Sequence, residues 1–438
     1  MFGALRQSDL RLLAAGGLVS GLGDWLLFVA LPFHVYRLTG SALATGGMWL
    51  ALTLPRLLVG SVAGVFVDRW DRRLTMVVAD LARAGALLPL LALDATGAVW
   101  IVYAVAFGQS AVGQFFGPAR SALVPRLVPP ERLAGANAAV KMGDELAMLA
   151  GAPLGGAVYG LVGMSGIVLL DAGSFVASAA LVALIGQTAP STASGAATGA
   201  ARGRGFWSAW WDGLRLVAAS GTVAATFLAA LLAALGQGII AVLWAVYVSD
   251  VLGGGPLEYG LVQAAVGIGS AGGGLVAARL AATGPGRVMG LGGIAVGLGL
   301  IGTFNLATLP PILALQLLVG LASMAAFVAR QSLLQAHVED EFRGRVFGAY
   351  GTSSALAVAV GMGFASGAGD LVGVAPLLNA AAALYLLGGV AALALLGSAP
   401  RAPGVARLGL LGTAGQSPAA LADSRAANRR GKNGSPDR

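Results

Sequence analysis

Several charged residues of this sequence stand inside long apolar stretches. The main ones are Asp24, Arg56 and the adjacent Asp144 and Glu145. In lipid, an unpaired charge costs about 2.5–3.5 kcal/mol on insertion scales, so charges that persist there are usually paired or functional. We expect Asp24 and Arg56, in neighbouring antiparallel helices, to form a pair. A carboxylate released from its arginine can take up a proton, whereas a permanent pair only positions two helices. All four residues are therefore candidates for lining a cavity or for coupling.

Three further charged groups have a structural interpretation. Asp80 and Arg83 share one face of a predicted helix, and Lys141 and Glu145 stand four residues apart on another. Spacings of three and four residues bring side chains together on a helix surface. We predict structural ion pairs at both places. Asp171 stands in the outer part of a further helix.

The sequence offers no catalytic centre, cofactor site or metal site. It contains no cysteine, and its two histidines, His34 and His337, are too few for a metal cluster. The G-x-G-x-x-G segments at 267–272 and 297–302 lie inside apolar stretches, whereas a dinucleotide site needs a preceding strand. The patterns G-x-x-x-x-G-K-[ST], H-E-x-x-H and G-x-S-x-G are not found. We therefore expect no enzymatic activity, no cofactor and no metal.

The elements that carry these charges are predicted to cross a membrane. Hydrophobic residues make up 57% of the chain, charged residues make up 11%, and a soluble domain carries roughly 25% charged residues. About 20 apolar residues cross the ~30 Å hydrocarbon core. We predict an all-α membrane protein whose twelve transmembrane helices lie near 12–36, 42–66, 74–94, 98–119, 138–160, 164–186, 222–248, 257–280, 287–307, 311–331, 345–368 and 372–397.

Basic residues gather in alternate loops, and this asymmetry predicts the orientation. The predicted outer loops hold one basic residue, Arg37, beside Asp94, Asp250, Glu258 and Asp370. The predicted inner loops hold Arg69, Arg72, Arg73, Arg120, Arg126, Arg132, Arg202, Arg204, Arg279, Arg287, Arg343 and Arg345. The positive-inside rule then places both termini in the cytoplasm of a multi-pass plasma-membrane protein. It also accounts for the net charge of +8 without a nucleic-acid partner.

The two halves of the chain resemble each other. Residues 119–131 align with residues 329–341 at an offset of 210, which also places Arg69 on Arg279. Parallel six-helix repeats characterise one transporter architecture, with the substrate site between the halves. We divide the chain into an N-terminal six-helix bundle (1–186), a cytoplasmic linker with an amphipathic helix (187–220), a C-terminal six-helix bundle (221–398) and a disordered cytoplasmic tail (399–438).

The loop between the second and third predicted helices carries a recognisable motif. Its residues are Gly64, Asp68, Arg69, Arg72 and Arg73. The loop resembles the G-x-x-x-D-R-x-G-R-R loop of the major facilitator superfamily, with Asp71 in place of the glycine. The resemblance implies the major facilitator fold. It also implies a gating role, in which the loop aspartate contacts the start of helix 11, near Arg343 and Arg345, and holds the halves together on the inside.

Helix 5 carries a second motif, made of Gly151, Pro153, Gly155 and Gly156. It is similar to the glycine-proline motif of exporters in the superfamily, with the proline displaced by one residue. Generic helix packing is the alternative. The segments 118–125 and 133–137, together with 23–25 and 170–175, resemble the macrolide-efflux and enterobactin-exporter branch.

The resemblance implies a secondary active transporter that works by alternating access as a monomer in the lipid bilayer. Its expected cargo is a small hydrophobic or amphiphilic molecule of drug, macrolide or siderophore type, and protons are the candidate coupling ion. Helix 4, from Ala98 to Ala119, lacks the embedded arginine of many proton-coupled antiporters. Uptake of a nutrient by the same fold is one alternative. A membrane enzyme or sensor that transports nothing is another.

Overall fold

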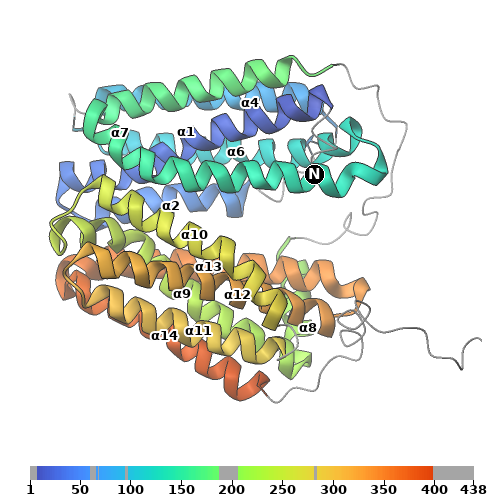
Figure 1. Ribbon diagram of the computed structural model, residues 1–438, viewed down its shortest axis with the longest axis vertical. Coiled ribbons are helices and arrows are strands. Elements are labelled where there is room, and N and C mark those ends of the chain that lie inside the picture. The colour runs from blue at the N-terminus through green and yellow to red at the C-terminus, as the bar shows by residue number, and fades with distance from the viewer. Residues whose placement is uncertain are drawn as a thin grey trace, which may run out of the picture. The chain divides into compact units, whose positions relative to one another are not determined.

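A computed structural model describes residues 7–59, 66–67, 69–93, 97–186, 206–280 and 284–397 (Figure 1). This part of the chain is helical. Its α-helices are α1 (Ser8–Thr39), α2 (Ala42–Leu58), α4 (Arg72–Leu87), α6 (Trp100–Leu127), α7 (Leu133–Ala183), α8 (Phe206–Ala219), α9 (Gly221–Asp250), α10 (Pro256–Leu280), α11 (Pro285–Phe304), α12 (Leu309–His337), α13 (Asp340–Val372) and α14 (Val374–Leu396).

Eight helical segments of the described residues are long and apolar enough to cross a membrane. One of them contains α7, whose 51 residues include Gly163 with φ +66° and ψ −168°. This backbone conformation suits glycine, and it breaks α7 into two helices that correspond to the fifth and sixth predicted spans. The remaining long helices α2, α6 and α10 supply the second, fourth and eighth spans. The fold therefore has the twelve spanning helices that the sequence predicts.

Some helices run further than the apolar stretches that predict them. The α6 helix ends at Leu127 and α12 at His337, whereas the apolar stretches end at residues 119 and 331. Hydropathy falls at the first arginine, but backbone hydrogen bonding continues past it. Arg120 and Arg330 consequently lie on helices, about two turns before the helix end.

The same pairing of helices occurs twice. In the first half α1 packs against α7, α2 against α6, and α4 against both α6 and α7. In the second half α9 packs against α13 and α14, α10 against α12, and α11 against both α12 and α14. These are equivalent pairs when α1–α7 are superposed in order on α9–α14. The repeat seen in the sequence is thus a repeat of packing as well.

The two bundles meet along α7 with α10, and along α2 with α13. Glycine permits both crossings. A Cβ on Gly156 would lie 2.1 Å from the carbonyl oxygen of Pro256, and one on Gly260 would lie 2.4 Å from that of Ala152. At the other crossing, a Cβ on Gly46 would overlap the Ser366 hydroxyl. No side chain fits at these three positions, so helices of opposite bundles approach closely there.

The amphipathic helix expected after the linker is present as α8 and packs on α13. Trp210 donates a hydrogen bond from Nε1 to the Ser353 hydroxyl at 3.2 Å, and Val217 is buried. Gly213 allows contact with the backbone of Arg345. Trp211, next to Trp210 on this helix, is 56% exposed.

Candidate functional site

A cavity of about 1260 Å³ lies between the two bundles. Helices α1, α2, α4 and α6 line it from the first bundle, and α9–α14 line it from the second. Its wall is mostly apolar. The aromatic residues of the wall are Trp25, Phe28, Trp49, Trp244, Tyr259, Phe327, Tyr350 and Tyr385. A space of this size and character suits a bulky apolar or amphiphilic molecule.

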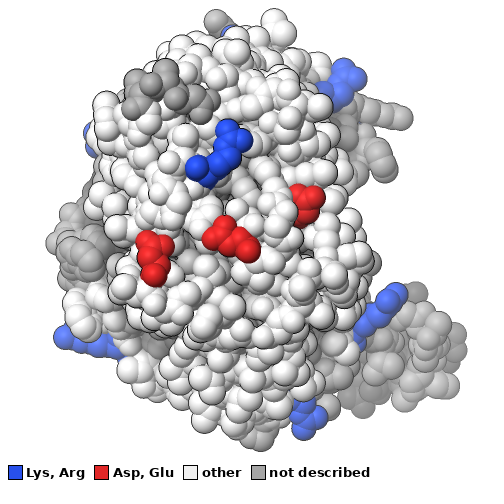
Figure 2. All heavy atoms as spheres, turned by 90° about the vertical axis from the view of Figure 1, so that its left-hand side faces the viewer, with Lys and Arg blue, Asp and Glu red and all other residues white. Residues whose placement is uncertain are grey.

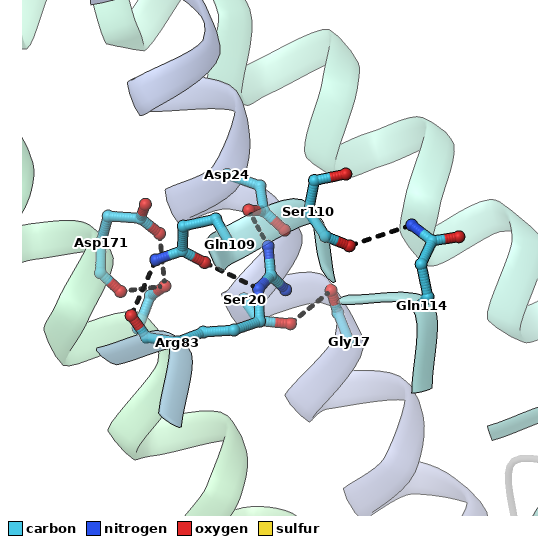
Figure 3. A network of polar contacts seen from close by, with 9 residues as sticks. Gly17, Ser20, Asp24, Arg83, Gln109, Ser110, Gln114 and Asp171 are labelled. Atoms are coloured by element: carbon cyan, nitrogen blue, oxygen red, sulfur yellow. Dashed lines mark hydrogen bonds and ion pairs between the residues drawn. The ribbon is translucent and has the colours of Figure 1, made fainter. Parts of the chain in front are cut away.

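The polar centre of the first bundle is built around Arg83 of α4, which reaches the cavity wall (Figure 3). Its Nη2 lies 2.5 Å from Oδ1 of Asp24, and its Nε donates to Oε1 of Gln109 at 2.9 Å. Gln109 returns a hydrogen bond to the Arg83 carbonyl oxygen at 2.7 Å. The guanidinium carbon lies 4.1 Å from the centroid of the Phe175 ring. Four helices thus meet at one arginine.

Two predicted pairings are wrong. Asp24 binds Arg83 and not Arg56, and Arg83 forms its ion pair with Asp24 and not with Asp80, which stands one turn earlier on α4. Similar depth in the membrane was the argument for the Asp24–Arg56 pair. Depth does not fix the rotation of a helix about its axis, and this rotation points Arg83 at Asp24. Arg56 instead lines the cavity, exposed and without an ion pair among the described residues.

Two more carboxylates are buried near this centre. Asp80 and Asp171 are 0% exposed and do not line the cavity. One Asp171 carboxylate oxygen lies 3.4 Å from the Ser174 hydroxyl. Gly23 of α1 makes room for Asp171, because a Cβ there would lie 2.4 Å from its carboxylate. The bundle therefore holds three carboxylates beside one guanidinium.

The charges in the first part of α7, from Lys141 to Glu145, are paired outside the cavity. Arg120 of α6 binds Asp144 through two hydrogen bonds of 2.8 and 3.0 Å. Lys141 and Glu145 form the expected ion pair at 3.1 Å, with both side chains largely exposed. Among the described residues, the cavity wall includes neither Asp144 nor Glu145. Asp144 therefore connects α6 with α7, Glu145 pairs within α7, and neither is placed to contact a substrate.

Carboxylates that the sequence marked only as outer-loop charges join the two bundles at one end. Asp250 accepts a hydrogen bond from the Tyr36 hydroxyl. Asp370 accepts from the backbone N–H of Ala42 at 3.3 Å and from the Ser41 hydroxyl at 3.4 Å. Figure 2 shows this end of the molecule, where acidic side chains lie across the middle of a largely uncharged face. In the sequence, these contacts were signalled only by the isolated acidic residues Asp250 and Asp370 in otherwise apolar loops.

The loop motif is described in part. Gly64 and Asp68 lie outside the described residues, so the latch stays a prediction. Asp71 begins α4 and accepts a hydrogen bond from the N–H of Leu74 at 2.7 Å, a helix cap that the usual glycine cannot provide. Arg73 donates to the carbonyl oxygen of Ala183, at the end of α7.

The helix 5 motif lies where the bundles cross. A Cβ on Gly151 would lie 2.6 Å from Trp25, and one on Gly155 would lie 3.0 Å from Leu26. Gly156 faces α10, and Pro153 contacts Gly260. The described part of the motif therefore forms the contact of α7 with α1 and α10, and it does not line the cavity.

The sequence that forms this architecture matches the model of a known protein family. The family model described as "Transmembrane secretion effector" (MFS_3) matches residues 1–401. The chain belongs to this family of the major facilitator superfamily. It is a multi-pass membrane protein of a transporter family.

Two curated relatives have an activity in their names. The multidrug efflux pump Tap of Mycolicibacterium fortuitum is 27% identical over 400 residues, which cover 88% of this chain and 95% of that protein. Macrolide efflux protein A of Streptococcus pyogenes is 31% identical over 173 residues, 39% of this chain and 43% of that protein. The matches to the first curated relatives span less than half of those proteins, as with the 42% of YfiS from Bacillus subtilis.

Solved structures share the fold. A bacterial homologue of the iron transporter ferroportin in an inward-facing state gives a TM-score of 0.70 at 17% identity, over 88% of this chain and 98% of that one. The nucleoside transporter NupG gives a TM-score of 0.69 at 12% identity, over 88% and 98% of the two chains. At such identities the likeness concerns the arrangement of helices.

Proposed function

We propose that this transporter exports small hydrophobic or amphiphilic molecules by alternating access. The observation that carries the proposal is the large aromatic cavity between two bundles that are joined at one end. Acidic side chains and glycine crossings join the bundles at the end where α2 and α10 begin. Arg330 and Tyr350, which lie nearer α8, line the cavity. The efflux named for Tap and for macrolide efflux protein A supports the same direction.

The orientation follows from the arginines. With both termini in the cytoplasm, the end of the cavity near α8 faces inward, and the end where the bundles are joined faces outward. A hydrophobic molecule then enters from the cytoplasm or the inner leaflet. The transporter is proposed to act as a monomer, with the cavity formed by one chain.

The Arg83 centre is the proposed coupling site. Asp24 is in contact with the cavity, while Asp80 and Asp171 are buried beside it. Separation of Asp24 from Arg83 would leave this carboxylate at the cavity wall without its cation, in the place proposed for the transported proton. Proton uptake from outside would then accompany release of the cargo.

Transport in inside-out vesicles tests the direction. Vesicles containing the protein should accumulate an amphiphilic dye when a pH gradient is imposed. Vesicles with Gly260→Leu, which blocks the crossing of α7 with α10, should not accumulate it. Intact cells should show the opposite sign, with lower dye content when the protein is expressed. Higher dye content in expressing intact cells would instead establish uptake.

A further inference from the structure

The repeat exposes a difference between two equivalent arginines. Arg330 of α12 corresponds to Arg120 of α6 at the offset of 210. Arg120 is held by Asp144 through two hydrogen bonds between α6 and α7. At the same offset, Asp144 corresponds to Ser354 of α13. The second half keeps the arginine and lacks its acid.

Arg330 accordingly has no carboxylate partner among the described residues. Its guanidinium carbon lies 4.9 Å from the ring centroid of Phe327 and 5.1 Å from that of Tyr350. The Nε atom is buried and has no hydrogen-bond acceptor. Aromatic faces stabilise the cation but do not use its N–H donors. Arg330 and Ser354 both line the cavity, so these donors are available to a bound molecule.

A second free arginine stands on the first bundle. Arg56, in the last turn of α2, lines the same cavity and has no ion pair among the described residues. Among the described residues, the charged side chains of the cavity wall are those of three arginines, Arg56, Arg83 and Arg330, and one aspartate, Asp24. Arg83 and Asp24 neutralise each other. The buried Asp80 and Asp171 do not reach the wall, so its described part carries two positive charges without a paired acid.

We propose that the cavity binds an amphiphilic anion. Arg330 and Arg56, from opposite bundles, bind its carboxylate, sulfonate or phosphate group, and the aromatic wall accepts its apolar part. A guanidinium binds planar oxyanions through paired N–H donors, which makes arginine well suited to this role. This inference rests on the proposed function and names the class of its substrate.

Because the two arginines stand on opposite bundles, a bound anion affects how closely the bundles can approach each other. Without an anion, the like charges of Arg330 and Arg56 oppose approach of the two bundles on the side that holds them. A bound anion between them removes the repulsion and draws the bundles together. Loading is thereby linked to the conversion between the two states.

Paired probes of opposite charge test the proposal. Binding of naphthalene-1-sulfonate and of trimethyl(1-naphthyl)ammonium to the purified full-length chain in nanodiscs is measured by calorimetry, with empty nanodiscs as blank. We expect the sulfonate to bind at least about tenfold more tightly, a difference of about 1.4 kcal/mol. Arg330→Gln and Arg56→Gln should each remove most of this preference, while Arg330→Lys and Arg56→Lys should retain part of it. Arg279→Gln, which removes an exposed arginine away from the cavity, should leave it unchanged.

The most direct variant rebuilds the first-half pair in the second half. Ser354→Asp should give Arg330 its missing acid and abolish the preference for the sulfonate, whereas Ser354→Asn should keep it. Equal binding of both probes to the unmodified chain, or preference for the ammonium, would overturn the proposal and leave export of other cargo intact. Tight sulfonate binding without transport in the vesicles would contradict the proposed function alone.

Discussion

Arg83 shows how one side chain can tie a bundle together and still face a substrate. It is 14% exposed, and its partner Asp24 is 43% exposed, so the carboxylate is the more accessible member of the pair. Gln109 and Phe175 fix the guanidinium independently of Asp24. Loss of the aspartate charge therefore leaves Arg83 in place. This arrangement separates the structural part of the site from the part proposed to carry a proton.

Asp24→Asn tests that separation. The variant should fold and bind cargo, because Arg83 keeps its other partners, and it should keep substrate exchange. Transport driven by a pH gradient should fall at least about tenfold, which is a normal effect of removing an essential proton carrier. Asp144→Asn serves as the control, since it removes a paired carboxylate of the same bundle outside the cavity. A stable Asp24→Asn protein with full pH-driven transport would exclude Asp24 from coupling.

At the scale of helices, the number and order of the spanning helices could be predicted from the sequence. Apolar length and the positions of arginines fixed twelve spans, and the offset of 210 matched equivalent helices. Rotation about each axis could not be predicted in the same way, because all faces of a membrane helix are apolar and the pattern is weak. The predicted pair of Asp24 with Arg56 was therefore wrong, and Asp24 binds Arg83. The sites at Asp250 and Asp370 were missed, because their contacts depend on how the two bundles meet.

The glycine crossing of α7 and α10 gives a prediction for this scale. Gly156→Val should reduce transport at least about tenfold, because its side chain would overlap the Pro256 carbonyl and force the bundles apart. Gly160→Val, one turn further along the same helix, has open space around its Cβ and should transport normally. Dye accumulation in inside-out vesicles at matched expression measures both. Equal activity of the two variants would show that the crossing tolerates separation.

At the scale of the whole molecule, the orientation decides which side the cavity serves. The absence of cysteine allows single substitutions to report it. Val251→Cys, at the closed end, should react with an impermeant maleimide in intact cells. Ala219→Cys, at the end of α8, should react only after the cells are permeabilised. Both positions are exposed, so the reverse pattern would invert the proposed topology and turn the end near α8 outward.

The closed end should loosen when its acids are neutralised. Asp250→Asn with Asp370→Asn weakens the contacts to Tyr36, Ser41 and Ala42 that join the bundles. Labelling of Leu31→Cys, which is 4% exposed and lines the cavity, should then rise several-fold from outside. Asp212→Asn, on α8, is the control and should not change it. Unchanged labelling in the double variant would mean that the glycine crossings alone hold this end closed.

The contact of Asp370 with α2 also bears on the rate of the transport cycle. Asp370 reaches the first backbone N–H of α2, while Ser41 of the same chain segment already accepts from Ala44 at 3.4 Å. When the bundles separate, the start of α2 keeps the hydrogen bond from Ala44 to Ser41, and the N–H of Ala42 donates to water in place of Asp370. A cap is worth about 0.5–2 kcal/mol, whereas driving a two-state protein from one form almost wholly to the other takes about 5.5 kcal/mol. The Asp370 contact is weak on this scale, so it can break in each transport cycle without holding the carrier in one state.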